Sequence, residues 1–167
     1  MLAAVLTAAS LSSCTKDGIE SFRGSYGYSM SGYISCEDPD GNTADFTVSK
    51  EIGTMHIEPK GDAAILTMDT VGGDVLVFDA NVDGDQITIS PIERLLSIEP
   101  RDSSITARKT IPVSMGGHGS KTNGLIVLSI EFGCDPFTMN YMEEGSVVSR
   151  EYTISSCNVN CIANFRD

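Results

Sequence analysis

The chain has 167 residues, of which 41% are hydrophobic and 20% charged, a composition typical of one globular domain with a sizeable core. It carries 23 Asp and Glu against 11 Lys and Arg, which gives a formal net charge of -12. A surface this acidic repels phosphate backbones and no basic cluster offsets it, so the sequence excludes nucleic-acid binding.

Residues 1–13 are apolar or small and carry no charge, as in the hydrophobic part of a signal peptide. The run is too short to span a bilayer. Leu11-Ser12-Ser13-Cys14 resembles the lipobox of bacterial lipoproteins, in which an apolar residue and two small residues precede an invariant cysteine. The resemblance implies that Cys14 carries the lipid and that its acyl chains hold the protein on a membrane.

Three segments are therefore expected. A signal peptide covers 1–13, the lipidated cysteine and a flexible tether cover 14–21, and a single β domain covers 22–167. The start of the tether, Thr15-Lys16-Asp17, lacks the strongly acidic run that resembles surface-export signals. We therefore expect an outer-membrane lipoprotein of the cell envelope that faces the periplasm.

Alternation of apolar and polar residues between turn signals predicts eight strands. The first, 22–36, has one aromatic and apolar face along its whole length. The second, 43–58, changes its apolar phase near Gly53, which predicts a β-bulge at that glycine. The remaining strands are expected at 63–70, 75–82, 86–90, 105–115, 125–132 and 147–156.

The segments between these strands are short. Asp83-Gly84-Asp85 predicts a tight hairpin, and such turns join neighbouring strands into an antiparallel meander. Residues 91–100, with a proline at each end, predict a helical turn or two, or a poorly formed strand. The glycine-rich run 116–124 predicts a loop, and 137–142 is an alternative ninth strand.

Eight antiparallel strands roll into one barrel or split into a two-sheet β-sandwich, and the barrel is favoured because closure removes exposed edges. The order of long bulged strands, meander, helical turn and three further strands resembles the lipocalin or calycin-like domains of small lipoproteins in Bacteroidetes-type envelopes. The resemblance implies an all-β, eight-stranded antiparallel meander barrel.

The interior of such a barrel is either a solid core or a ligand cavity. Tyr26, Tyr28 and Met30 share the apolar parity of the first strand and should point inward. In a narrow barrel they pack against the other strands, and in a flared one they line a pocket for a small apolar or planar guest. The sequence favours the core and leaves the pocket open.

Four cysteines follow the lipidation site, and an envelope location favours disulfides. In an eight-stranded meander, Cys36 and Cys134 end strands at the same end of the barrel, whereas Cys157 and Cys161 lie at the opposite end. This predicts the pairs Cys36–Cys134 and Cys157–Cys161. A ninth strand would instead bring Cys36 toward Cys157 or Cys161.

No motif for catalysis or metal binding emerges. His56 should face outward from a strand, and the glycine-rich run around His118 lacks the Walker pattern. The acidic stretches 38–45 and 79–85 lack EF-hand spacing and are typical of turns. No Gly-x-Ser-x-Gly elbow is present. We therefore expect no metal, no cofactor and no enzymatic activity.

The expected function is a lipid-anchored binding or structural module of the cell envelope. Its partners would be the membrane, through the anchor, and a small hydrophobic ligand or a partner protein. Two alternatives are an inhibitor or accessory protein that acts through its loops, and a hydrolase whose carboxylates the sequence does not mark.

Overall fold

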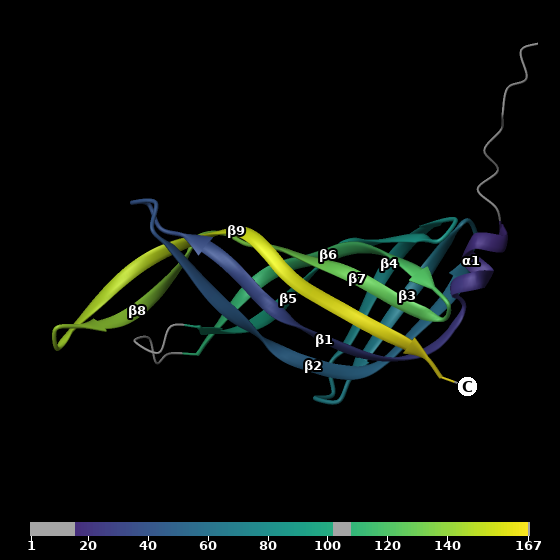
Figure 1. The fold of residues 1–167 in the computed structure, drawn as a ribbon, viewed down its shortest axis with the longest axis horizontal. Helices are drawn as coiled ribbons and strands as arrows, with labels where there is room; N and C mark the ends of the chain where they lie inside the picture. Colours follow the sequence, from purple (N-terminus) through teal and green to yellow (C-terminus); the bar gives the residue numbers. More distant parts are fainter. Residues whose placement is uncertain (1–15, 102–107, 167) are drawn as a thin grey trace, which may run out of the picture.

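The computed structural model describes residues 16–101 and 108–166. This part of the chain forms one short helix and nine strands (Figure 1). In chain order they are α1 (Lys16–Phe22), β1 (Gly24–Glu37), β2 (Thr43–Lys60), β3 (Ala63–Thr70), β4 (Val75–Asp83), β5 (Gln86–Pro100), β6 (Lys109–Thr122), β7 (Leu125–Gly133), β8 (Phe137–Glu143) and β9 (Ser146–Phe165).

Every strand pairing is antiparallel, and the strands follow the order β1 to β7, then β9 and β8. An additional pairing of β1 with β9 closes eight of them into a ring. The predicted all-β, barrel-like meander is confirmed. In the described chain β8 lies outside the ring and pairs with the first half of β9.

The molecule is elongated along its strands. Helix α1 and the C-terminus lie at one end, which we call the helix end (Figure 1). The turn after β1, residues 38–42, and the β8–β9 hairpin lie at the other, which we call the hairpin end. Long strands such as β1 and β2 run from one end to the other.

The segment 91–100 is strand rather than helical turn. It continues β5, where the register with β6 shifts between Ile89 and Ile92. Pro91 sits at this bulge, so its missing N–H interrupts no regular ladder. Beyond it, alternate residues turn inward again, and Leu96 and Ile98 are buried.

The glycine-rich run is also strand, because β6 extends to Thr122. A Cβ on Gly117 would lie 2.4 Å from the Ser129 carbonyl oxygen, and one on Gly119 would lie 1.9 Å from that of Val127. These glycines therefore let β6 and β7 approach closely. Residues 105–107 of the predicted strand lie outside the described residues.

Helix α1 occupies most of the segment expected to be a flexible tether. Ile19 and Phe22 are three residues apart, on one face of the helix, and both are buried against the barrel. The Tyr26 hydroxyl donates a hydrogen bond to the Phe22 carbonyl at 2.6 Å. The tether prediction is therefore wrong from Lys16 onward, and Cys14 lies outside the described residues.

The phase change in β2 occurs earlier than predicted. Met30 pairs with Glu51 and Gly32 pairs with Val48, so two residues of β2 lie opposite Ser31 alone. The bulge is therefore at 49–50, and Gly53 lies beyond it in the regular ladder.

Candidate functional site

Tyr26, Tyr28 and Met30 point into the barrel, as predicted, and belong to one buried apolar cluster. Their exposed fractions are 0%, 4% and 0%. Tyr26 is held by its bond to Phe22 and by the Lys121 ammonium, 2.9 Å from its hydroxyl. Because these side chains are almost fully buried, they support the interpretation that the first strand packs into a solid core and does not line a ligand cavity.

A buried ion pair lies near Tyr28. Arg94 of β5 meets Glu51 of β2 in a two-pronged contact, with nitrogen–oxygen distances of 2.5 and 3.1 Å. The two side chains are 8% and 17% exposed. The Tyr28 hydroxyl has no hydrogen-bond partner among the described residues, and burial, followed by the Glu51 charge, raises its pKa. The sequence does not mark this pair, because its pattern leaves open whether 91–100 is a helical turn or a poorly formed strand.

The four described cysteines are free thiols. Cys157 and Cys161 lie on the same strand, four residues apart, which separates their Cα atoms by about 13 Å, far beyond disulfide reach. That predicted pair is wrong. The pair Cys36–Cys134 is not formed either.

The ninth strand, β8, changes the strand parity that had placed Cys157 and Cys161 at the end of the barrel opposite Cys36, and β9 runs through both of these cysteines. Cys157 pairs in register with Ile34, two residues before Cys36. Burial raises the pKa of Cys36 to about 12, and the neighbouring thiols Cys134 and Cys157 add to the shift. Burial also raises the pKa of Cys161, on the interior opposite Met30, to about 12.

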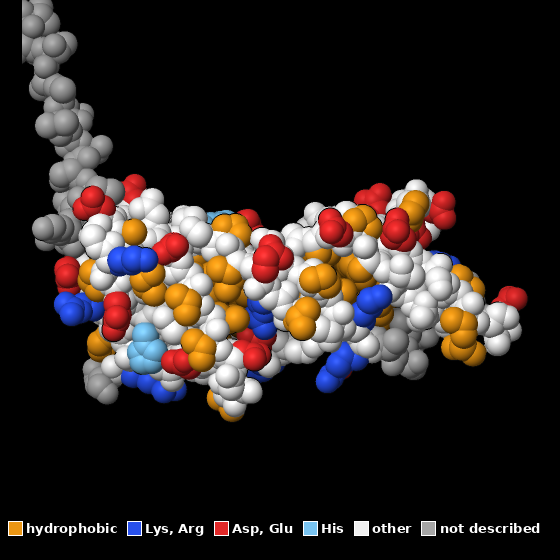
Figure 2. All heavy atoms as spheres, turned by 180° about the vertical axis from the view of Figure 1, so that it is seen from behind, with side chains coloured by type: hydrophobic (Ala, Val, Ile, Leu, Met, Phe, Trp, Pro, Cys, Tyr) orange, Lys and Arg blue, Asp and Glu red, His pale blue; other side chains and the backbone are white. Residues whose placement is uncertain are grey.

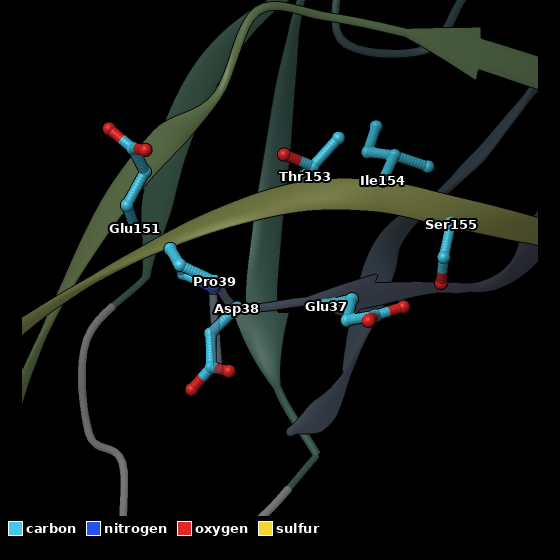
Figure 3. A pocket seen from close by; sticks show the side chains of 7 residues that line it. All are labelled: Glu37, Asp38, Pro39, Glu151, Thr153, Ile154 and Ser155. Carbon is cyan, nitrogen blue, oxygen red and sulfur yellow. The ribbon is translucent and has the colours of Figure 1, made fainter. Parts of the chain in front are cut away.

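Two pockets at the hairpin end lie around the turn 38–42. A pocket of about 370 Å³ is lined by Glu37 at the end of β1, by Asp38 and Pro39 of the turn, and by residues 151 and 153–155 of β9 (Figure 3). A second, of about 390 Å³, lies beside Val148–Glu151 of β9. Asp38 and Pro39 line both, so the turn forms the wall between the two hollows.

Asp38 organises this turn. Its Oδ1 accepts hydrogen bonds from the backbone N–H groups of Asn42, at 2.8 Å, and Asp40, at 3.0 Å. The Asn42 amide also donates to Oδ2, at 3.0 Å. These donors, the Asn42 side chain foremost, lower the pKa of Asp38. Asp38 is therefore a structural carboxylate, as the turn reading of 38–45 predicts.

The other carboxylates around the turn are exposed. Glu37 and Glu151 line the first pocket, and Asp40 and Glu151 line the second. Figure 3 shows that the carboxyl groups of Glu37, Asp38 and Glu151 point in different directions. Arg150 also lines the second pocket, so the carboxylates there outnumber one cation and leave a net negative surface.

A cluster of buried aromatic side chains packs inside the hairpin end. Phe46 of β2 packs edge-on against Phe137 and Tyr152, at centroid distances of 5.7 and 5.4 Å. The hydroxyls of Tyr141 and Tyr152 share a hydrogen bond. These contacts join the β8–β9 hairpin to β2 and extend the buried core of the barrel to the hairpin end.

The outer surface carries several exposed apolar side chains. Val71, Val75 and Val77 of the β3–β4 hairpin are 76%, 59% and 51% exposed, and Met142 and Val147 face outward at the tip of the β8–β9 hairpin. Figure 2 shows hydrophobic side chains scattered among acidic ones along one broad face.

The two histidines face outward, as expected of His56. His118 lies on β6, and its Nδ1 is 3.4 Å from Glu131 Oε1. Over residues 16–101 and 108–166, no three His, Cys, Asp or Glu side chains are arranged to hold a metal ion.

Comparison of the chain with protein-family models, with curated proteins and with solved structures gives no match. Among the described residues, no helix has the length and apolar character needed to cross a membrane.

Proposed function

We propose that the protein is a lipid-anchored module of the cell envelope that uses its hairpin end to bind a cationic peptide segment of a partner protein. The observation that supports this most is the separation of the two ends. The helix end follows directly on the expected lipid at Cys14, and the pockets around 38–42 lie at the opposite end (Figure 1). A protein held by its N-terminus would present those pockets away from the membrane.

The chemistry of the hairpin end indicates the class of partner. Glu37, Asp40 and Glu151 are exposed carboxylates beside two hollows, and the chain as a whole has a charge of -12. Lys and Arg side chains suit such a surface because opposite charges steer encounter and fix register. Exposed Met142 and Val147 on the adjacent hairpin add apolar contact.

The core packing of Tyr26, Tyr28 and Met30 shifts the proposal from a ligand inside the barrel to a partner outside it. Of the three expected functions, it is therefore closest to an accessory protein that acts through its loops.

The test uses the full lipidated chain in phosphatidylcholine vesicles and a fluorescent peptide of alternating Lys and Leu. The triple variant Glu37→Gln/Asp40→Asn/Glu151→Gln should weaken binding at least about 10-fold, and binding should weaken as salt rises. Asp38 stays unchanged because it holds the turn.

A matched control removes charge at the helix end, where Glu58 and Asp62 are also exposed. Asp83 is exposed beside α1 as well, so Glu58→Gln/Asp62→Asn/Asp83→Asn removes three charges, as the site variant does, and should leave binding within about twofold of the unaltered chain. Equal losses in the two variants would mean that only net charge matters, and the proposed site would be wrong. The anchor is tested separately, since Cys14→Ala should leave the protein in the soluble fraction.

A further inference from the structure

The outer face of β1, β2 and β3 assembles a serine, a histidine and an aspartate. Ser25 lies directly opposite His56 in the β1–β2 register, and its Oγ is 2.8 Å from His56 Nδ1. The other ring nitrogen, Nε2, is 3.5 Å from Asp69 Oδ2. The three residues are 13 to 44 positions apart in sequence, and the sheet brings them together.

The carboxylate fixes the direction of these contacts. Ionised Asp69 has acceptors only, so it favours the tautomer with the proton on His56 Nε2. Nδ1 then carries a lone pair, and the Ser25 hydroxyl donates to it. A hydroxyl that donates to a neutral imidazole, itself oriented by a carboxylate, is arranged for general-base activation.

A cation lies on the same face. The Arg166 backbone N–H donates to the Ser25 carbonyl at 2.9 Å, and its guanidinium donates to Thr54 Oγ1 at 3.1 Å. A Cβ on Gly27 would lie 2.7 Å from Arg166 Nε. The absence of a side chain at Gly27 therefore makes room for the guanidinium, one side-chain position along β1 from Ser25.

We propose that Ser25 is a nucleophile that hydrolyses carboxylic esters, with His56 as general base, Asp69 as the residue that positions His56, and Arg166 as the charge that stabilises the oxyanion. This activity is independent of the partner site at the hairpin end. Because the His56 and Asp69 side chains are 42% and 47% exposed on the convex outside of the barrel, the site suits a small acyl group carried on a larger molecule.

The reaction is balanced by water alone. Ser25 Oγ bonds to the ester carbonyl carbon while its proton passes to His56 Nδ1, and the carbonyl electron pair moves to oxygen. That pair returns as the bond to the leaving alkoxide breaks, and the alkoxide takes the proton from His56. Water then attacks the acyl-serine by the same route, which releases a carboxylic acid and restores Ser25.

The test uses the full chain in detergent, with p-nitrophenyl acetate as substrate and a fluorophosphonate as covalent probe. The probe should label Ser25, as mapped by peptide mass spectrometry. Ser25→Ala should abolish labelling and lower the hydrolysis rate about 100-fold, and His56→Gln should lower both rates about 100-fold. Arg166→Gln should lower hydrolysis about 10-fold.

Asp69 acts through His56, so its test needs a rescue. Asp69→Asn should slow labelling about 10-fold, whereas Asp69→Glu should keep it within about threefold, at equal thermal midpoints. If Asp69 only stabilised the fold, the probe would label Asp69→Asn and Asp69→Glu at the same rate.

Two matched controls come from the same barrel. Ser29 lies on the same face of β1 but opposite Ile52, and His118 pairs with a carboxylate, with no serine hydrogen bond among the described residues. Ser29→Ala and His118→Gln should change neither rate. The proposal is overturned if the unaltered chain is not labelled at Ser25, if Ser25→Ala hydrolyses as fast as the unaltered chain, or if His118→Gln matches His56→Gln.

Discussion

Arg94 and Glu51 show how a polar pair is accommodated inside this barrel. Each side chain has given up most of its water, and each is compensated by the other through two short contacts. Arg94 also lies 3.5 Å from the Met115 sulfur, so the guanidinium packs against apolar surface as well.

Removing one partner of this pair should be costly. Arg94→Met leaves the Glu51 carboxylate buried without its cation, and it should lower the free energy of unfolding by about 3–5 kcal/mol. The double variant Arg94→Met/Glu51→Leu leaves no uncompensated charge and should be more stable than Arg94→Met alone. Urea denaturation measures both, and a double variant less stable than the single one would contradict this account.

The buried thiols predict a loss of stability in alkali. Cys36 and Cys161 have pKa values raised from 9.0 to about 12 by burial. Below pH 9 these thiols are protonated in both the folded and the unfolded chain. Between pH 9 and 12 only the unfolded thiols ionise, so the free energy of unfolding should fall as pH rises through this window.

Urea denaturation between pH 8 and 10.5 measures the slope. Cys36→Ala/Cys161→Ala removes both groups and should make the decline with pH shallower. Equal slopes in the two proteins would assign the alkaline loss to other groups.

At the scale of the strand, the predictions that rest on alternation within one segment are more accurate than those that rest on how two strands pair. The strand over 63–70 matches β3 at both ends because tight turns bound it, and the inward parity of Tyr26 and Tyr28 is confirmed. Successive residues of a strand point to opposite faces, so the alternation of apolar and polar residues along one segment is enough to show which of them point inward.

The register between two strands depends on both of them, so one segment alone does not reveal it. The predictions that depended on register were wrong or missing. The bulge at 49–50 shifts the second half of β2 against β1, and this shift decides that His56 lies opposite Ser25. Pro91 marked a break where the structure has a bulge. The Arg94 side chain shares the inward parity of Leu96 and Ile98, a signal that would have revealed the buried pair if 91–100 had been treated as a strand.

The close approach of β1 and β9 at Gly32 predicts that a larger residue there destabilises the protein. Gly32 has φ +148, and a Cβ there would lie 2.1 Å from the Asn158 carbonyl oxygen of β9. Since the obstacle is backbone, it cannot rotate away, and Gly32→Ala should lower the free energy of unfolding by about 2–4 kcal/mol. Gly133→Ala is the control, because no atom lies within 4 Å of its added Cβ and it should be nearly neutral. Similar losses would contradict this explanation.

At the scale of the whole molecule, the two ends have different chemistry. The helix end is joined to the barrel by Ile19, Phe22 and the Lys121 ammonium, which also contacts the Ser21 carbonyl. The hairpin end carries exposed carboxylates over an aromatic core. The proposed partner site and the Ser25 site therefore lie far apart along β1, and each can be altered without the other.

The seam between the first and last strands has a mechanical consequence. β1 and β9 pair from Tyr26 to Glu37, along nearly the whole length of β1, with one register shift between Ser35 and Cys36. If a partner pulls on the hairpin end while the N-terminus is held, the tension runs parallel to these strands. Their hydrogen bonds then bear the load together in shear instead of parting one at a time, so a barrel joined in this way resists extension between its two ends.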